Sequence, residues 1–126
     1  MGLLAFLAVG LGAALGAWLR WGLGNVLNAA FPTLPMGTLA ANLIGGYVIG
    51  LAVAFFGQHP GLSPEARLFI ITGFLGGLTT FSTFSAEAVG LLTRGEVFWA
   101  LVHMGSHLGG SLLLTWLGML TVKAIL

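Results

Sequence analysis

One apolar stretch of this chain contains, at residues 73–85, the sequence GFLGGLTTFSTFS. Three glycines precede five hydroxyl residues within seven positions, and neither residue type favours the interior of a helix. Arg67 and Arg94 flank the stretch 27 residues apart, which at the rise of an α-helix is about 40 Å, the thickness of a bilayer with its headgroups. Gly76 to Thr80 therefore fall near the midplane, where freed backbone groups must be paired by protein, water or an ion. We expect a helix that is broken at this point.

The composition of the whole chain indicates an integral membrane protein. Hydrophobic residues make up 58% of the 126 residues and charged residues 6%, whereas a soluble domain has about 25% charged residues. A net charge of +1 leaves no basic surface for nucleic acid, and the absence of cysteine excludes disulfides and thiolate chemistry. A spanning helix needs about 20 residues. We expect an all-α fold in one domain, residues 1–126, with four spans at about 2–27, 36–57, 65–93 and 97–123.

The ends of the third span carry helix signals. Ser63 is a capping hydroxyl, Pro64 suits the first helical position and Glu65 places an acid in the first turn. Gly95 suits a helix stop. The third span is therefore predicted to begin and end beside short turns.

The charges near the span ends do not fix the orientation of the chain. Four spans place Arg67 and Lys123 on one side of the membrane and Arg20 and Arg94 on the other. Two against two gives no positive-inside bias. This balance is either chance in a small sample or a sign that the chain inserts in both orientations and forms an antiparallel dimer.

Glycine supplies 21 residues, many of them at helical spacing. Small residues four apart let helix backbones approach closely in lipid. Four small helices hide little polar surface alone, so we expect an oligomer, although tight packing within one chain would also explain the pattern. The pairs are Gly12–Gly16, Gly46–Gly50, Gly73–Gly77 and Gly105–Gly109.

Several polar or aromatic side chains inside the spans each allow two interpretations. Freed carbonyls beside hydroxyls suit a small hard cation such as Na⁺, but a glycine kink satisfied by neighbouring hydroxyls is the alternative. Phe81 and Phe84 share one helix face and either pack or turn their electropositive ring edges toward an anion. Asn42 is either a donor to an ion or an interhelical hydrogen-bonding group. Arg20 is either an interfacial anchor or attracts anions at a pore mouth.

The fourth span carries a polar ridge, which either lines a pathway or packs against a neighbouring helix. Its members recur at steps of four residues and are His103, His107, Ser111 and Thr115. No acid accompanies this ridge, so we expect no transition-metal site on it. Glu87 is the only acid well inside a span and lies nearer one rim than the centre, which suits a vestibule role or a pairing with a basic residue better than proton-coupled transport.

Two long motifs resemble those of the Fluc (CrcB) fluoride channel family. They are GTLAANLIG at residues 37–45 and GFLGGLTTFSTFSAE at residues 73–87, and the likeness covers all four spans. The resemblance implies an antiparallel, dual-topology homodimer with two fluoride pores and a central structural Na⁺ at the interface. Dual topology agrees with the balanced charges.

The resemblance also implies roles for particular residues. The backbone carbonyls of Gly76 and Thr79 would hold the Na⁺, while Phe81, Phe84 and Asn42 would contact fluoride. Arg20 and Glu87 would belong to the vestibule. A polar track would follow the pore through Ser82 and Thr115, and spacing extends this track through His103, His107 and Ser111.

The activity implied by the resemblance is passive, fluoride-selective conduction rather than enzyme catalysis. It would lower cytoplasmic fluoride across the cell membrane of a bacterium and so give fluoride resistance. Fluoride is strongly hydrated, and a pore must replace its water with donors that still let the ion leave. The alternative is a small dual-topology proton-coupled antiporter. That class needs a central acid in its first span, which has none here.

Overall fold

The computed structural model describes residues 2–126, and every regular element in that range is a helix. The long helices are α1 (Leu3–Leu27), α2 (Met36–Gln58) and α6 (Val97–Ile125). The third span is composed of four shorter elements. They are α3 (Pro64–Arg67), the π-helix η1 (Leu68–Leu75), α4 (Gly76–Leu78) and α5 (Ser82–Thr93).

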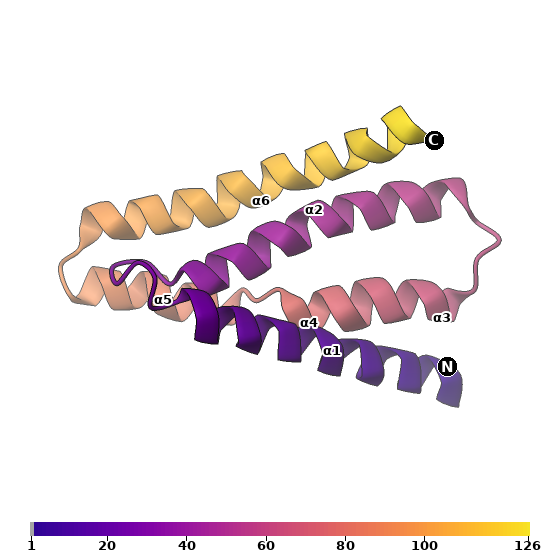
Figure 1. Ribbon diagram of the computed structural model, residues 1–126, viewed down its shortest axis with the longest axis horizontal. Coiled ribbons are helices and arrows are strands. Elements are labelled where there is room, and N and C mark those ends of the chain that lie inside the picture. Colours follow the sequence, from indigo (N-terminus) through magenta and orange to yellow (C-terminus); the bar gives the residue numbers. More distant parts are fainter. Residues whose placement is uncertain (1) are drawn as a thin grey trace.

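Four helical segments are long and apolar enough to cross a membrane, which confirms the predicted number of spans. They cover Leu3–Leu27, Met36–Gln58, Pro64–Thr93 and Val97–Ile125. Both termini lie at the same end of the molecule as the α2–α3 connection, and the other two connections lie at the opposite end (Figure 1). This is the arrangement that an even number of antiparallel spans requires.

The predicted helix signals act as expected. The Ser63 hydroxyl oxygen accepts a hydrogen bond from the Ala66 N–H at 3.2 Å, with Pro64 at the first position of α3. Gly95 has a φ of 78°, a conformation that glycine adopts without strain, and it ends the turn after α5. A further contact, which the sequence did not predict, occurs at the start of α2, where Asn28 Oδ1 accepts from the Gly37 N–H at 2.7 Å.

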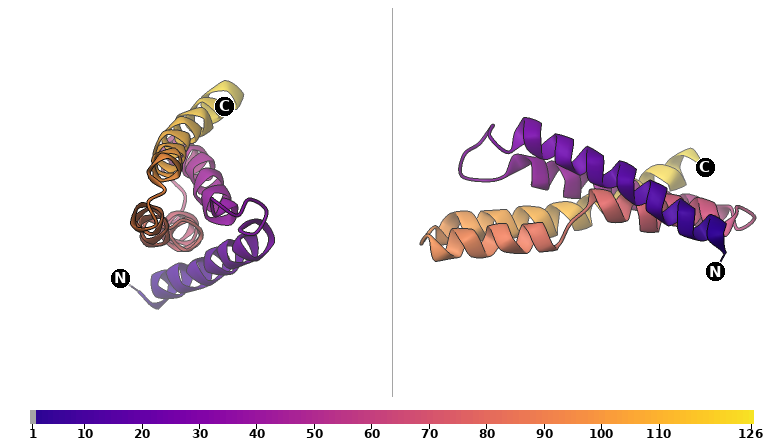
Figure 2. Two further views of the ribbon diagram at one scale, coloured as in Figure 1. Left: turned by 90° about the vertical axis from the view of Figure 1, so that its left-hand side faces the viewer. Right: turned by 90° about the horizontal axis from the view of Figure 1, so that it is seen from below.

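Close backbone approach between helices explains many of the glycines. A Cβ atom on Gly16 would fall on the Phe74 carbonyl oxygen, and one on Gly73 would lie 2.8 Å from the Val9 carbonyl oxygen. Likewise, a Cβ atom on Gly50 would fall on the Thr115 carbonyl oxygen. Helix α1 therefore packs against η1, and α2 packs against α6, with glycine at the contact. The two pairs diverge when seen along the bundle (Figure 2).

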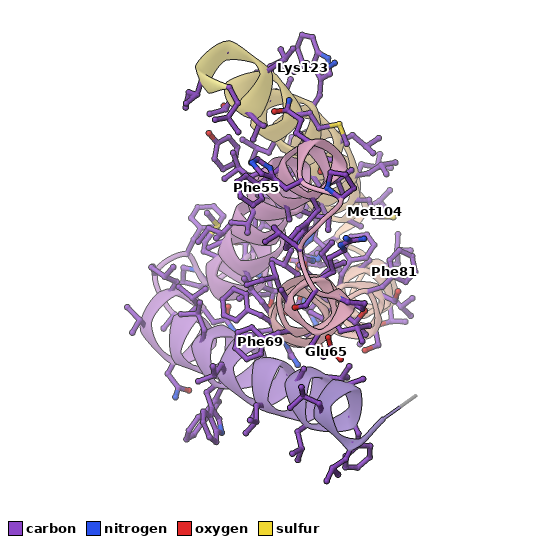
Figure 3. All side chains as sticks on the ribbon, turned by 90° about the vertical axis from the view of Figure 1, so that its right-hand side faces the viewer. Phe55, Glu65, Phe69, Phe81, Met104 and Lys123 are labelled. Atoms are coloured by element: carbon purple, nitrogen blue, oxygen red, sulfur yellow. The ribbon has the colours of Figure 1, made fainter. Side chains whose placement is uncertain are left out.

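Large apolar side chains cover much of the outer surface. Phe6, Trp21 and Phe98 are examples of exposed rings, and the side chains extend outward around the whole bundle, including Phe55 and Phe81 (Figure 3). The buried interior is small, with one cluster formed by Ala41, Leu75 and Leu78. A surface of this kind suits contact with lipid.

Candidate functional site

The third span loses its helical geometry beside Asn42. Helix α4 ends at Leu78, Thr79 has extended backbone angles (φ −89°, ψ 156°), and α5 begins at Ser82. A continuous helix would direct the Thr80 N–H to the carbonyl of Gly76. The Thr80 N–H instead donates to Asn42 Oδ1 at 2.8 Å, and Asn42 Nδ2 donates to the Thr80 carbonyl at 3.0 Å. The side-chain amide of Asn42 thus pairs both backbone groups of Thr80.

Other groups of the break are also paired within the chain. Arg20 Nε donates to the Gly77 carbonyl at 3.0 Å, so this cation lies on the break. The Thr79 hydroxyl donates to the Leu75 carbonyl at 2.8 Å. These bonds stabilise a break that lipid would otherwise leave unsatisfied.

An open cavity of about 730 Å³ lies beside the break and brings most of the predicted pore residues together. Within the described residues, no Lys, Arg, Asp or Glu side chain lines it. Ser82, Arg20, Glu87 and His103 lie outside its lining. The predicted site residues that do line it are Asn42, Gly76, Thr79, Phe81, Phe84, His107, Ser111 and Thr115.

Aromatic and imidazole rings form one wall of this cavity. The ring centroid of Phe84 lies 5.5 Å from that of Phe81 and 4.6 Å from that of His107. The His103 ring stacks on Phe84 with its centroid 5.3 Å from that of Phe84, and His103 does not line the cavity. Phe84 is therefore held between the break and α6, whereas the Phe81 side chain is 79% exposed.

The hydrogen bonds of Asn42 determine which atom of His107 carries a proton. The two bonds to Thr80 fix the orientation of the amide, so its second N–H points to His107 Nδ1 at 2.9 Å. A neutral His107 ring then accepts at Nδ1 and carries its proton on Nε2. Asn42 has consequently committed both N–H groups, and the Nε2 atom of His107 is buried without a hydrogen-bond partner.

The other hydroxyls differ in whether they can still donate. The Thr115 hydroxyl donates to the Gly46 carbonyl at 2.9 Å, so its proton is committed. The Ser111 hydroxyl forms no hydrogen bond within the described residues, and Ser111 lines the cavity. The hydroxyls of Thr80 and Ser82 face each other at 3.4 Å, where either can donate.

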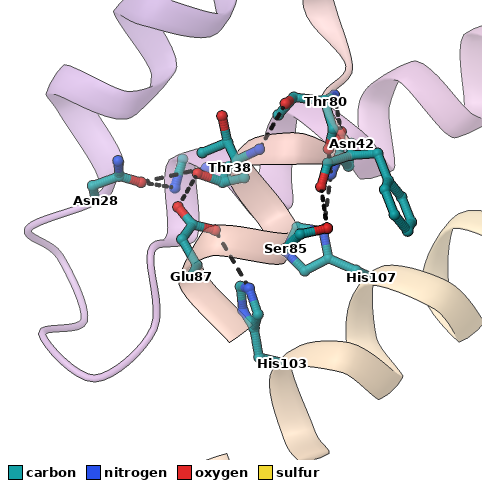
Figure 4. A network of polar contacts seen from close by, with 11 residues as sticks. Asn28, Thr38, Asn42, Thr80, Ser85, Glu87, His103 and His107 are labelled. Atoms are coloured by element: carbon teal, nitrogen blue, oxygen red, sulfur yellow. Dashed lines mark hydrogen bonds and ion pairs between the residues drawn. The ribbon is translucent and has the colours of Figure 1, made fainter. Parts of the chain in front are cut away.

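A second polar cluster lies between α2, α5 and α6 (Figure 4). The Thr38 hydroxyl donates to Glu87 Oε2 at 2.7 Å, and His103 Nε2 lies 3.4 Å from Glu87 Oε1. The expectation that no acid accompanies the histidine ridge is wrong. Glu87 is not on α6, but α5 packs against α6 and brings the Glu87 carboxylate next to His103. Sequence separation along α6 alone could not reveal this neighbour.

Two residues of the site were missed in the sequence. Thr38 is 5% exposed and holds the carboxylate of Glu87, and Thr80 provides both backbone partners of Asn42. Both belong to the quoted motifs, at residues 37–45 and 73–87, but hydroxyls in those runs carried no signal of a specific partner.

The chain matches a known family over nearly its whole length, which confirms the resemblance seen in the sequence. The family described as CrcB-like protein, Camphor Resistance (CrcB) matches residues 7–119. A protein of Cupriavidus pinatubonensis is 66% identical over 99% of both chains. One of Nitrosospira multiformis is 66% identical over 98% of this chain and 96% of its own. One of Pseudomonas putida (strain W619) is 64% identical over 93% of this chain and 92% of its own. Each of these relatives is named fluoride-specific ion channel FluC. The present chain belongs to the CrcB family.

Proposed function

We propose that this protein is a fluoride-selective ion channel rather than an enzyme, and that it carries fluoride passively out of a bacterial cell across the inner membrane. The observation that carries the proposal is the 66% identity, over almost the full length of both chains, to relatives named fluoride-specific ion channel. The four membrane-spanning helices agree with this role. Loss of cytoplasmic fluoride would protect the cell.

The chemistry of the cavity supports anion conduction. Fluoride must exchange its water for donors, and the cavity lining includes Ser111, whose hydroxyl can donate, and the rings of Phe81 and Phe84, whose edges are electropositive. None of these carries a fixed positive charge, so the ion is bound weakly enough to leave. The committed N–H groups of Asn42 and the committed hydroxyl of Thr115 would shape the pore and would contact the ion only after their present bonds break.

Two copies in antiparallel orientation would complete the pore. Phe81 lies at the open side of the cavity with 79% of its surface exposed, which is where a second copy would cover it. Gly105 and Gly109, unlike the other paired glycines, have no atom within 4 Å of an added Cβ. They leave α6 a smooth surface for a partner helix. The balance of basic residues between the two sides fits insertion in both orientations.

A structural Na⁺ at the dimer interface is the second part of the proposal. Gly76 and Thr79 line the cavity, at a break where the Thr80 N–H donates to Asn42 and not to the Gly76 carbonyl. Carbonyl oxygen suits a hard cation. Each copy would contribute the backbone carbonyls of Gly76 and Thr79, and the ion would hold the broken helices of the dimer together.

Efflux from liposomes tests the function directly. Vesicles that hold the purified protein and KF are diluted, a K⁺ ionophore is added, and released fluoride is followed with an electrode. We expect rapid fluoride release and negligible chloride release in the matched KCl experiment. The Phe81→Ile variant should keep its dimer on size-exclusion chromatography and lose most of the flux. Fluoride movement that follows a proton gradient and ignores voltage would favour the antiporter instead.

Removal of sodium tests whether Na⁺ stabilises the proposed dimer. Protein purified in potassium buffer without Na⁺ should dissociate toward monomer at lower temperature than protein in sodium buffer, as measured by chromatography after heating. Equal dimer stability in both buffers would contradict a structural role for Na⁺.

A further inference from the structure

Three buried polar atoms without a hydrogen-bond partner lie together between α5 and α6. They are Glu87 Oε1, His103 Nε2 and His107 Nε2. His103 is 1% exposed and His107 is 4% exposed, so neither ring nitrogen reaches water outside the protein. An unpaired buried polar atom is costly, and three at one place point to a common ligand.

The geometry of these side chains suits a metal cation. One ligand atom from each of Glu87, His103 and His107 lies within 4.8 Å of the others. Around a tetrahedral zinc ion with bonds of about 2.0–2.1 Å, ligand atoms are separated by roughly 3.3 Å. Glu87 Oε1 and His103 Nε2 are already 3.4 Å apart, so only His107 must approach.

A neighbouring hydroxyl already orients one of the three ligands. The Thr38 hydroxyl donates to Glu87 Oε2 at 2.7 Å and leaves Oε1 free to bind. Asn42 contacts His107 Nδ1 at 2.9 Å and leaves Nε2 free. A hydrogen bond to the second oxygen of a ligating carboxylate fixes the direction of the ligand and raises the affinity for metal.

We propose that Glu87, His103 and His107 form a binding site for a divalent transition-metal cation, of which Zn²⁺ is the probe. Two imidazoles and one carboxylate are typical ligands for zinc, and the fourth position is open for water. This site differs from the proposed Na⁺ site in its position and in its nitrogen ligands, which suit a borderline-soft cation rather than a hard one.

A plain ion pair between Glu87 and His103 accounts for less of the arrangement. At 3.4 Å the two atoms are in charge-pairing range, but both still lack an aligned hydrogen bond. An ion pair also leaves His107 Nε2 without a partner. A cation between the three atoms satisfies all of them at once.

Metal binding would disturb the Asn42 network. Ligation through Nε2 moves the ring proton of His107 to Nδ1, where it faces an Asn42 N–H group. The hydrogen bond between Asn42 and His107 must then break, and one Asn42 N–H becomes free. Occupancy of the site is therefore coupled to the donor that faces the cavity.

Zinc titration of the tag-free protein in detergent tests the proposal. Isothermal calorimetry should show saturable binding of one Zn²⁺ per chain. His103→Gln, His107→Gln and Glu87→Gln should each weaken it at least about tenfold, a loss that even removal of a supporting group produces. His59→Gln is the matched control: it removes the remaining histidine of the chain, which is partly exposed and follows the end of α2, and it should leave the affinity unchanged.

Cobalt provides a readout that needs no variant. Co²⁺ bound to the wild-type protein should show the intense visible absorption of a four-coordinate ion, and excess Zn²⁺ should remove it. The proposal is overturned if zinc binds the wild type and the doubly substituted His103→Gln/His107→Gln protein equally, or if bound Co²⁺ keeps the weak spectrum of the hydrated ion. Neither readout uses fluoride flux, so failure of the metal site and failure of the channel are distinguishable.

Discussion

The side-chain amide of Asn42 forms a two-way pair with the backbone of Thr80, accepting from its N–H at 2.8 Å and donating to its carbonyl at 3.0 Å. The two residues are 38 positions apart and lie on different spans. This pair replaces a helical hydrogen bond at the point where the third span loses its helix, so Asn42 is first of all the group that stabilises the break.

Removing this amide should therefore destabilise the protein as well as stop conduction. Asn42→Ala leaves the Thr80 N–H and carbonyl unpaired, at a cost of up to about 1–3 kcal/mol for each of these partly buried groups. We expect a lower thermal unfolding temperature by circular dichroism in detergent and loss of fluoride efflux. Asn25→Ala is the control, because Asn25 is exposed on α1. If Asn42→Ala kept the stability of the Asn25→Ala protein, Asn42 would have no structural role in the break.

Arg20 should contribute to stability in a way that other basic residues do not. Its Nε donates to the Gly77 carbonyl at 3.0 Å, in a partly buried position. Arg20→Gln should cost about 1.5–3 kcal/mol, the range for a hydrogen bond to a charged group. Arg94→Gln should cost less than about 1 kcal/mol, because Arg94 pairs with Glu96 at 3.7 Å on an exposed surface. Chemical denaturation of both variants measures the difference, and equal losses would contradict the assigned role of Arg20.

The spans were predictable because each depends on local composition. The second span was expected at 36–57, and α2 covers Met36–Gln58. Ser63 and Gly95 gave their signals through side-chain and backbone chemistry that acts within a few residues. Long apolar runs and capping residues therefore define the membrane topology without information about tertiary contacts.

The contacts of the site were not predictable in the same way. The neighbour of His103 is Glu87, on another helix, and it reaches the histidine only through the packing of α5 on α6. The partner of Asn42 depends on how α2 meets the break. The π-helix at Leu68–Leu75 could not be predicted either, because an apolar run of this composition is equally compatible with an α-helix.

The bond between Thr38 and Glu87 predicts a clear difference between two substitutions. Thr38→Val keeps the shape of the side chain but removes the hydroxyl that donates to Glu87 Oε2 at 2.7 Å. Because Thr38 is 5% exposed, water cannot easily replace this donor, and we expect a loss of about 1.5–3 kcal/mol. Thr38→Ser keeps the hydroxyl and should lose much less. Thermal unfolding of the two variants side by side makes the measurement, and matching unfolding temperatures would show that the hydroxyl contributes nothing.

Glycine at the contact between α1 and η1 should be far less replaceable than glycine on the outer face of α1. A Cβ atom on Gly16 would fall on the carbonyl oxygen of Phe74, and a backbone atom cannot move aside as a side chain can. Gly10 has no atom within 4 Å of an added Cβ. Gly16→Ala should therefore force α1 away from the third span and reduce the yield of folded protein, whereas Gly10→Ala should be neutral or stabilise α1 by up to about 1 kcal/mol through helix propensity. Size-exclusion chromatography and thermal unfolding distinguish the two. A Gly16→Ala protein as stable as Gly10→Ala would mean that α1 and η1 do not meet at this glycine, and the support that Arg20 gives to the break from α1 would then need another explanation.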